Sequence, residues 1–296
     1  MYAQDLVQVH GYIQGRFTDQ EGTPDRLEIR RARLIVTGEP ASNLSYRFQV
    51  DFAKSPYLMD ASISYKLSTA LSISAGQMKI PFSAESVISD DRNPPVSRSR
   101  AVLALSPGRD TGVQGRDVGL QTAGAFGARN RSWMEYSAGV FRGQTFVNAP
   151  KVHYNATAGR AIFHPVHGLS AGADWYGSFS APPGMVKRRE DLEAEYHWRK
   201  LLVRGEQIWA RDGTLRRRGG YLLGAWRLSD RWEAVARADW LTKNPAKPDT
   251  GSIAYIAGGN LYLFNHIKIG LNGGAQWNQN SRAWSSVLVA QIMAYF

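Results

Sequence analysis

In the stretch LSYRFQVDFA (Leu44–Ala53), apolar and polar residues alternate without interruption. Tyr46 and Phe48 fall on one side of the segment, and Arg47 and Gln49 fall on the other. A period of two residues indicates a β-strand with two chemically different faces. The rest of the chain indicates which surroundings each face meets.

The same alternation recurs from one end of the chain to the other and predicts about sixteen antiparallel strands. Turn residues separate the predicted strands. These span residues 5–18, 26–37, 43–54, 57–67, 70–80, 113–124, 131–142, 152–163, 168–179, 187–198, 200–211, 217–228, 231–242, 252–263, 266–277 and 284–296. No stretch predicts a helix. We therefore expect residues 1–296 to form a single all-β domain.

The predicted connections alternate in length. Tight ones include LSTA (67–70) and RK (199–200). The longer set includes RGQTFVNAP (142–150), APPGM (181–185) and RDGTLRR (211–217), and the longest connection runs from Phe82 to Thr111. Short turns at one end and longer loops at the other are typical of an up-and-down outer-membrane barrel.

The apolar face does not have the composition of a dense protein core. Many of its positions are Ala or Gly, and Trp232 and Trp240 lie eight residues apart on one strand. That spacing corresponds to roughly 20 Å along a barrel axis, close to the ~25 Å between the aromatic girdles of such barrels. A core of a β-sandwich is the alternative for these two tryptophans. The charged face, with Arg47, Lys66 and Asp60, suits a water-filled lumen better than a dry interior.

Composition gives broader limits. The 36 Lys and Arg against 25 Asp and Glu give a net charge of +11, so anionic partners are expected. There is no cysteine, hence no disulfide framework or thiolate metal site. No apolar run approaches the ~20 residues of a membrane helix. The N-terminus lacks the pattern of a signal peptide, which indicates either a cytoplasmic protein or a mature envelope chain.

Several motifs in order resemble the phosphate-selective porin O and P family. They are EIRRARLIVTG, LSYRFQVDFA, LMDASISYKL, LSISAGQMKIPFSAE, GRDVGLQTAGAF, GYLLGAWRLSDRWEAVARADWL, AYIAGGNLYLF and the C-terminal strand that ends in Phe296. The resemblance covers nearly the whole chain. It implies a sixteen-stranded homotrimeric channel of the bacterial outer membrane that passes small anions, such as phosphate, by passive diffusion.

The resemblance also implies that residues 82–112 fold into the lumen and narrow it. Arginine offers a fixed fork of donors that matches phosphate oxygens. Arg30 and Arg31 match the paired arginines of the family's second strand, one of which should face the lumen. The loop departs from the phosphate-specific members, because it has no lysine and its four arginines meet four acids. Anion preference is therefore a safer expectation than phosphate selection.

From these arguments we expect two groups of basic residues to act on solutes. The predicted pore constriction, or anion-binding set, comprises Arg92, Arg98, Arg100, Arg30, Arg47, Arg16, Arg204 and Arg237. The predicted pore mouth comprises Lys187, Arg188, Arg189, Arg216, Arg217 and Arg218. Like charges at a mouth raise the local anion concentration. Binding of lipopolysaccharide phosphates is the alternative role for the mouth, and salt bridges to the wall are the alternative for the loop.

Other functions find little support in the residues. The six histidines are scattered, and no nucleophile motif such as G-x-S-x-G appears, so neither catalysis nor a cofactor or metal is expected. The aromatic residues lie opposite the charges, which argues against nucleic-acid binding. The alternative to a porin is a barrel that anchors a partner in an envelope assembly and conducts poorly.

Overall fold

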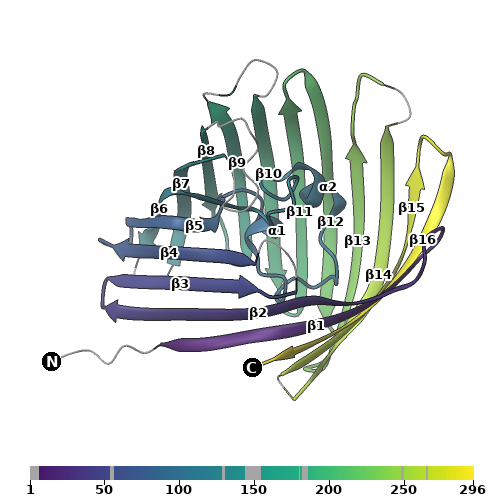
Figure 1. Cartoon of the computed structure of the whole chain (residues 1–296), viewed down its shortest axis with the longest axis horizontal. Coiled ribbons are helices and arrows are strands. Elements are labelled where there is room, and N and C mark those ends of the chain that lie inside the picture. The colour runs from purple at the N-terminus through teal and green to yellow at the C-terminus, as the bar shows by residue number, and fades with distance from the viewer. Residues whose placement is uncertain are drawn as a thin grey trace.

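The computed structural model describes residues 7–53, 57–128, 131–143, 155–179, 181, 186–247, 250–264 and 266–296. Within these residues, sixteen antiparallel strands close into a barrel in which β1 pairs with β16 (Figure 1). The strands are β1 (Gln8–Gln20), β2 (Arg26–Ala41), β3 (Leu44–Asp51), β4 (Leu58–Lys66), β5 (Ser72–Lys79), β6 (Arg116–Ala128), β7 (Arg131–Phe141), β8 (Asn155–Phe163), β9 (Leu169–Phe179), β10 (Lys187–Trp198), β11 (Leu201–Asp212), β12 (Leu215–Arg227), β13 (Trp232–Thr242), β14 (Gly251–Leu263), β15 (Ile267–Asn278) and β16 (Ala283–Tyr295). The predicted barrel is confirmed.

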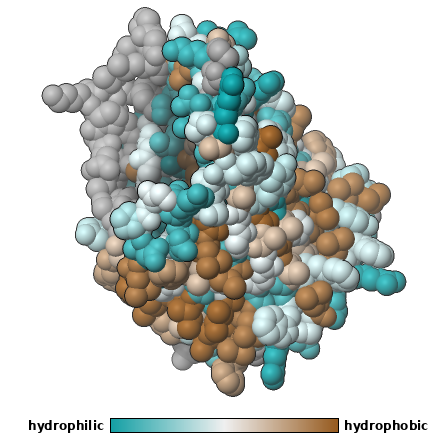
Figure 2. All heavy atoms as spheres, turned by 90° about the vertical axis from the view of Figure 1, so that its right-hand side faces the viewer, coloured by the Kyte–Doolittle hydropathy of each residue, from teal (hydrophilic) through white to brown (hydrophobic). Residues whose placement is uncertain are grey.

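The two faces of each strand separate as the alternation predicts. In β3, Gln49 and Asp51 are buried on the inner side, whereas Phe48 is exposed on the outer side. Trp232 and Trp240 both point outward, with 54% and 37% of their surface exposed. Figure 2 shows apolar residues in a broad band across one outer face of the barrel. The outside is therefore apolar and the inside polar, as in outer-membrane barrels.

Met59 is an exception to the predicted faces. The alternation places Met59 on the apolar outer face, but its side chain is fully buried. Gln49 pairs with Asp60 and the next residue of β3, Val50, pairs with Leu58, so Met59 is an extra residue in a β-bulge. A bulge shifts the side chains that precede it by one position, and period-two counting does not reveal it.

The connections differ from the prediction at one place. RDGTLRR was expected as a longer loop, but β11 continues to Asp212 and β12 begins at Leu215. The turn therefore contains only Gly213, which has a φ of 58°, and Thr214. The predicted connections at 142–150 and 181–185 lie mostly outside the described residues.

Two short helices, which the sequence did not predict, lie in the segment between β5 and β6. They are α1 (Ala84–Val87) and α2 (Arg100–Leu105). Each begins after a serine whose hydroxyl caps it: Ser83 Oγ accepts a hydrogen bond from Ser86 N at 3.1 Å, and Ser99 Oγ accepts one from Ala101 N at 3.2 Å. Helices of four and six residues are too short to show a helical period. Neither described helix is long and apolar enough to cross a membrane.

The segment from 80 to 115, which contains α1 and α2, lies within the ring of strands (Figure 1) and bonds to side chains of distant strands. Ser83 N donates to Asp174 Oδ2 of β9 at 2.6 Å, and Val96 N donates to Asn272 Oδ1 of β15 at 2.9 Å. On another side, Asp90 pairs with Arg33 of β2 at 2.9 Å. Because β9 lies about half-way round the strand order from β1, these contacts attach the segment to opposite parts of the wall.

Candidate functional site

Arginine side chains from two strands and from the 80–115 segment converge on one cavity of ≈140 Å³. Its arginines are Arg16 on β1, Arg30 and Arg31 on β2, and Arg98 and Arg109 in the segment. Asp90 is the single acidic residue among those that line it. We call these six residues and the volume between them the arginine cavity.

A β-bulge brings Arg30 and Arg31 to the same cavity. Gln14 of β1 pairs with Arg31, and the following Gly15 pairs with Ile29, so Arg30 is left without a cross-strand partner. A bulged strand does not alternate at that point, and two consecutive side chains can share one side. The expectation that one of the two arginines faces the lumen is therefore wrong, because both line the cavity.

Asp90 organises one side of the cavity. Its carboxylate is 2.7 Å from Arg98 Nη2, 2.9 Å from Arg33 Nη2 and 3.3 Å from Arg31 Nε. Burial would raise the pKa of Asp90, but the guanidinium groups of Arg98, Arg33, Arg31 and Arg109 hold that pKa well below its ordinary value. Asp90 is thus ionised and fixes the segment to β2.

Arg16 and Arg30 form no ion pair with a carboxylate within the described part of the chain. Arg16 Nε donates to Gln291 Oε1 at 3.1 Å, and another of its nitrogens contacts the Val96 carbonyl. Arg16 Nη1 also lies 3.5 Å from Ser97 Oγ. Arg30 Nε is buried without a hydrogen-bond partner among the described residues. These groups can donate to an incoming anion.

Arg109 adds a further buried positive charge. Its Nε donates to Ser86 Oγ at 3.1 Å and its Nη2 donates to the Ser86 carbonyl at 2.8 Å. Burial and the neighbouring Arg98 lower the pKa of Arg109 well below its ordinary value. A negative charge in the cavity would relieve that repulsion.

Three of the predicted wall arginines lie outside the arginine cavity and contact carboxylates. Arg47 pairs with Asp60 at 3.2 Å, and Arg204 pairs with Glu195. Arg237 pairs with Asp239 at 2.8 Å.

Arg237 also holds the segment, because its Nη1 donates to the Ser97 carbonyl at 2.7 Å and its Nη2 donates to the Arg98 carbonyl at 3.1 Å. In the segment itself, Arg100 Nη1 donates to Ser252 Oγ at 3.2 Å, and Arg92 is exposed. Of the eight predicted arginines, the structure therefore brings Arg16, Arg30 and Arg98 together in the cavity.

The predicted mouth cluster divides into two groups. Lys187 and Arg189 point inward and pair with Asp110 at 3.3 and 2.9 Å. Arg217 contacts Asp212 and donates to the Ala104 carbonyl at 3.2 Å. These three residues tie the 80–115 segment to the wall.

The other three residues of the mouth cluster, Arg188, Arg216 and Arg218, are exposed and alternate with the inward group. Arg188 is opposite Arg211 on β11, and Arg211 is opposite Arg216 on β12, so a row of arginines crosses the outer surface of three strands.

Sequence reasoning did not consider Arg33, and it left Arg31 and Arg109 out of the predicted constriction set. Arg33 is the most connected of them, since it bonds to Asp51 at 3.0 Å and to the Tyr12 hydroxyl at 2.7 Å. The alternation in IRRAR places Arg33 on the same face as Arg31, so this signal was present in the sequence.

Comparisons with known proteins agree with the architecture. The model of the family "Phosphate-selective porin O and P" matches residues 7–168. A comparison with curated proteins finds no matching sequence.

Among solved structures, a loop L8 deletion mutant of the outer membrane protein OmpT of Vibrio cholerae is 10% identical, with a TM-score of 0.75 over 99% of this chain and 100% of that one. In vitro folded OmpT of V. cholerae in a trimer form is 12% identical, with a TM-score of 0.72 over 99% and 100%. An anion-selective porin from Comamonas acidovorans is 13% identical, with a TM-score of 0.73 over 99% and 100%. At these identities the similarity shows a shared fold.

Proposed function

Given that the chain belongs to the phosphate-selective porin O and P family and is a porin of the bacterial outer membrane, we propose that it passes small hydrophilic solutes passively and prefers anions. The family and the fold point to a channel rather than an enzyme. Inorganic phosphate is the anion that we propose as a test solute, because guanidinium forks match its oxygens.

The arginine cavity carries this proposal. Five guanidinium groups and one carboxylate line a space of ≈140 Å³, so the cavity holds a marked excess of positive charge. A positive cleft with low-dielectric walls concentrates anions, and charged rings at a narrow point set the selectivity of a channel. We propose that residues 82–112 form the constriction and that the cavity lies on its permeation side.

Two partner contacts are part of the proposal. The trimer form of in vitro folded V. cholerae OmpT supports a homotrimer for this chain. The outward row of Arg188, Arg211 and Arg216 supports contact with lipopolysaccharide phosphates at the outer surface, because adjacent like charges on paired strands favour a shared anionic ligand.

The test is block of chloride current by phosphate in a planar bilayer, with wild type, Arg30→Gln and Arg47→Gln compared. Phosphate is expected to block wild type. The Arg30→Gln variant should weaken block by about tenfold or more, because a hydrogen bond to a charged group contributes about 1.5–3 kcal/mol. The matched control Arg47→Gln removes one lumen charge outside the cavity and should change block by less than about twofold.

If phosphate blocks the chloride current of Arg30→Gln and Arg47→Gln equally, the arginine cavity is not the site at which phosphate binds. If the wild-type channel conducts but phosphate does not block it, the protein is a general porin without this anion site.

A further inference from the structure

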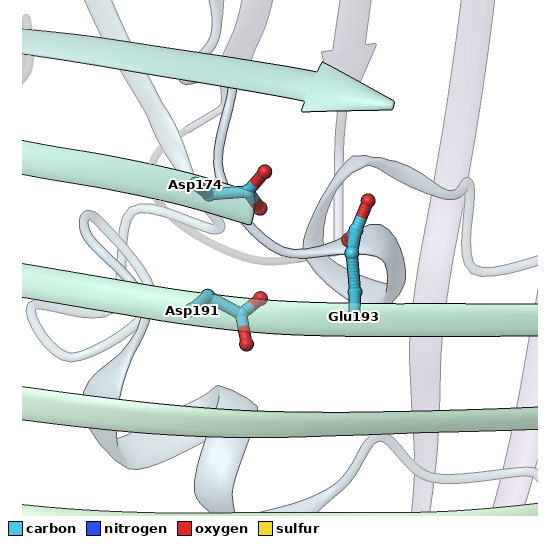
Figure 3. Close-up of side chains that lie close together, drawn as sticks. All are labelled: Asp174, Asp191 and Glu193. Carbon is cyan, nitrogen blue, oxygen red and sulfur yellow. The ribbon is translucent and has the colours of Figure 1, made fainter. Parts of the chain in front are cut away.

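A second cluster of charged residues lies inside the barrel, away from the arginine cavity. Asp174 of β9 and Asp191 and Glu193 of β10 each place one carboxylate oxygen within 4.8 Å of the others. Figure 3 shows the three side chains on neighbouring strands. Their exposed fractions are 4%, 2% and 6%, so the carboxylates are buried.

The strand register forces acids to face one another. Asp191 is directly opposite Asp174, and Glu193 is directly opposite Glu206 of β11. Like charges in directly opposite positions of an antiparallel sheet destabilise it. Two such pairs side by side require a compensating positive charge.

The protein supplies little of that charge. Arg160 is the basic residue with ion pairs to the cluster among the described residues, at 2.5 Å from Glu193 Oε1 and 3.7 Å from Asp174 Oδ1. Four buried carboxylates thus face one guanidinium. Burial of an unpaired carboxylate is costly.

The protein instead orients the carboxylates from outside. Ser83 N donates to Asp174 Oδ2 at 2.6 Å, and Glu85 N donates to Glu206 Oε1 at 2.7 Å. The Tyr221 hydroxyl donates to the same Glu206 oxygen at 2.6 Å. Such outer contacts fix the direction of metal-binding carboxylates.

Several other oxygens of these four carboxylates accept no hydrogen bond. In the described part of the chain, both oxygens of Asp191 and one each of Asp174, Glu193 and Glu206 have no hydrogen-bond donor. Asp191 is the clearest case, because neither of its oxygens meets an N–H or hydroxyl donor among the described residues, and its carboxylate is almost fully buried beside the other two acids (Figure 3).

Protons are the alternative source of compensation. Glu206 faces Asp191, and two carboxyl groups form a hydrogen bond when one of them holds a proton. One shared proton would satisfy that pair, but it would leave Glu193 Oε2 without a hydrogen bond and Asp174 Oδ1 with only the 3.7 Å ion pair to Arg160. The spacing of Asp174, Asp191 and Glu193 would allow one cation to contact an oxygen of each of them.

We propose that Asp174, Asp191 and Glu193, flanked by Glu206, bind a single hard divalent cation, with Ca²⁺ as its best match. Hard cations take carboxylate oxygens, and Ca²⁺ accepts six to eight oxygens in irregular geometry. The cluster offers neither the imidazole nor the thiolate ligands that softer metals prefer.

The cation would also fasten the 80–115 segment to the wall. Ser83 and Glu85, which hold two of the carboxylates, lie at the start of α1. A bound cation would also remove negative charge from the lumen and thereby favour anions, a consequence that rests on the proposed function. The binding of the cation does not rest on the proposed function.

Isothermal titration calorimetry of the folded barrel in detergent, with CaCl₂ at about neutral pH, tests the site directly and needs no conduction. The wild type is expected to bind one Ca²⁺ per chain. Asp191→Asn should weaken binding by about tenfold or more, as loss of a metal-site group does. The matched control Glu195→Gln removes a carboxylate two residues along the same strand that pairs with Arg204, and it should bind like wild type.

Absence of Ca²⁺ binding by wild type would overturn the proposal and assign the cluster to shared protons. Equal affinity of wild type and Asp191→Asn would also overturn it. If Asp191→Asn does not fold, Asp174→Asn carries the same expectation. A current that proves not to be anion-selective would contradict the proposed function and leave this binding result unaffected.

Discussion

At the residue scale, Asp90 is the contact on which the arrangement of the arginine cavity depends. Its carboxylate joins Arg31 and Arg33 of the wall to Arg98 of the segment. Removal of one partner from a buried charge pair costs about 3–5 kcal/mol because the other charges stay buried. One side chain therefore links the wall arginines to those of the segment.

We predict that Asp90→Asn loosens the 80–115 segment while the barrel persists. Hydrogen–deuterium exchange should increase at backbone amides of residues 84–105, since the anchor to β2 is lost, and stay low in the strands. Asp230→Asn, in an exposed turn, is the control and should leave exchange unchanged. Unchanged exchange in Asp90→Asn would show that the other anchors suffice.

The depressed pKa of Asp90 gives a pH prediction. A carboxyl whose folded pKa lies below its unfolded value contributes stability above the unfolded value, ~3.9. That contribution is lost as pH falls through the lower, folded pKa. Exchange in residues 84–105 should thus stay low at about pH 4 and rise only under more acidic conditions. A rise already at about pH 5 would contradict this ionic anchor.

At the element scale, the closure of the barrel depends on the contact between β1 and the C-terminus. Gly11 N donates to the Phe296 carbonyl at 2.9 Å, and Phe296 N donates to the Gly11 carbonyl at 3.1 Å. A Cβ at Gly11 would lie 2.6 Å from Phe296 Cζ and would also clash with the Arg33 carbonyl. The absence of a side chain lets the terminal ring approach the strand.

Gly11→Ala should therefore destabilise the barrel by about 1–3 kcal/mol, the usual cost of overpacking. Urea unfolding followed by tryptophan fluorescence in detergent would measure the difference. Gly224→Ala in β12 is the matched control, because an added Cβ there meets nothing within 4 Å. Equal stability of the two variants would show that the Phe296 ring moves aside at no cost.

The strands could be predicted from the sequence because each one repeats the same signal. Lipid outside and water inside force alternation at every position, as LSYRFQVDFA shows. The bulges at Arg30 and Met59 each add a residue without changing composition. Period-two counting therefore placed Met59 on the wrong face and did not reveal that Arg30 and Arg31 share a side. The capped helices α1 and α2 depend on serine caps and on contacts with distant strands, which are not local signals.

The site was harder to predict than the fold for a related reason. Arg237 and Arg16 both face inward on strands, and alternation treats them alike. Their roles differ because Arg237 forms an ion pair with Asp239, whereas Arg16 donates hydrogen bonds to Gln291 and to the Val96 carbonyl. That difference depends on which residues the register and the 80–115 segment bring together.

At the scale of the whole molecule, the inner charges include two separate regions, one with an excess of arginines and one with an excess of acids. The arginine cavity lies beside β1 and β2, and the acidic cluster lies on β9 to β11, half-way round the strand order. The 80–115 segment contacts both. The segment is therefore anchored on both sides of the lumen, by Asp90 in the arginine cavity and by Ser83 and Glu85 at the acidic cluster.

The reversal potential of the wild-type channel in a planar bilayer, under a potassium chloride gradient, tests the central claim most directly. An excess of arginine at the proposed constriction predicts a reversal potential of the sign expected for a chloride-selective channel. This potential should move towards zero in the double variant Arg16→Gln/Arg30→Gln. A potential set by potassium, or a folded barrel that carries no current, would contradict an anion-preferring porin.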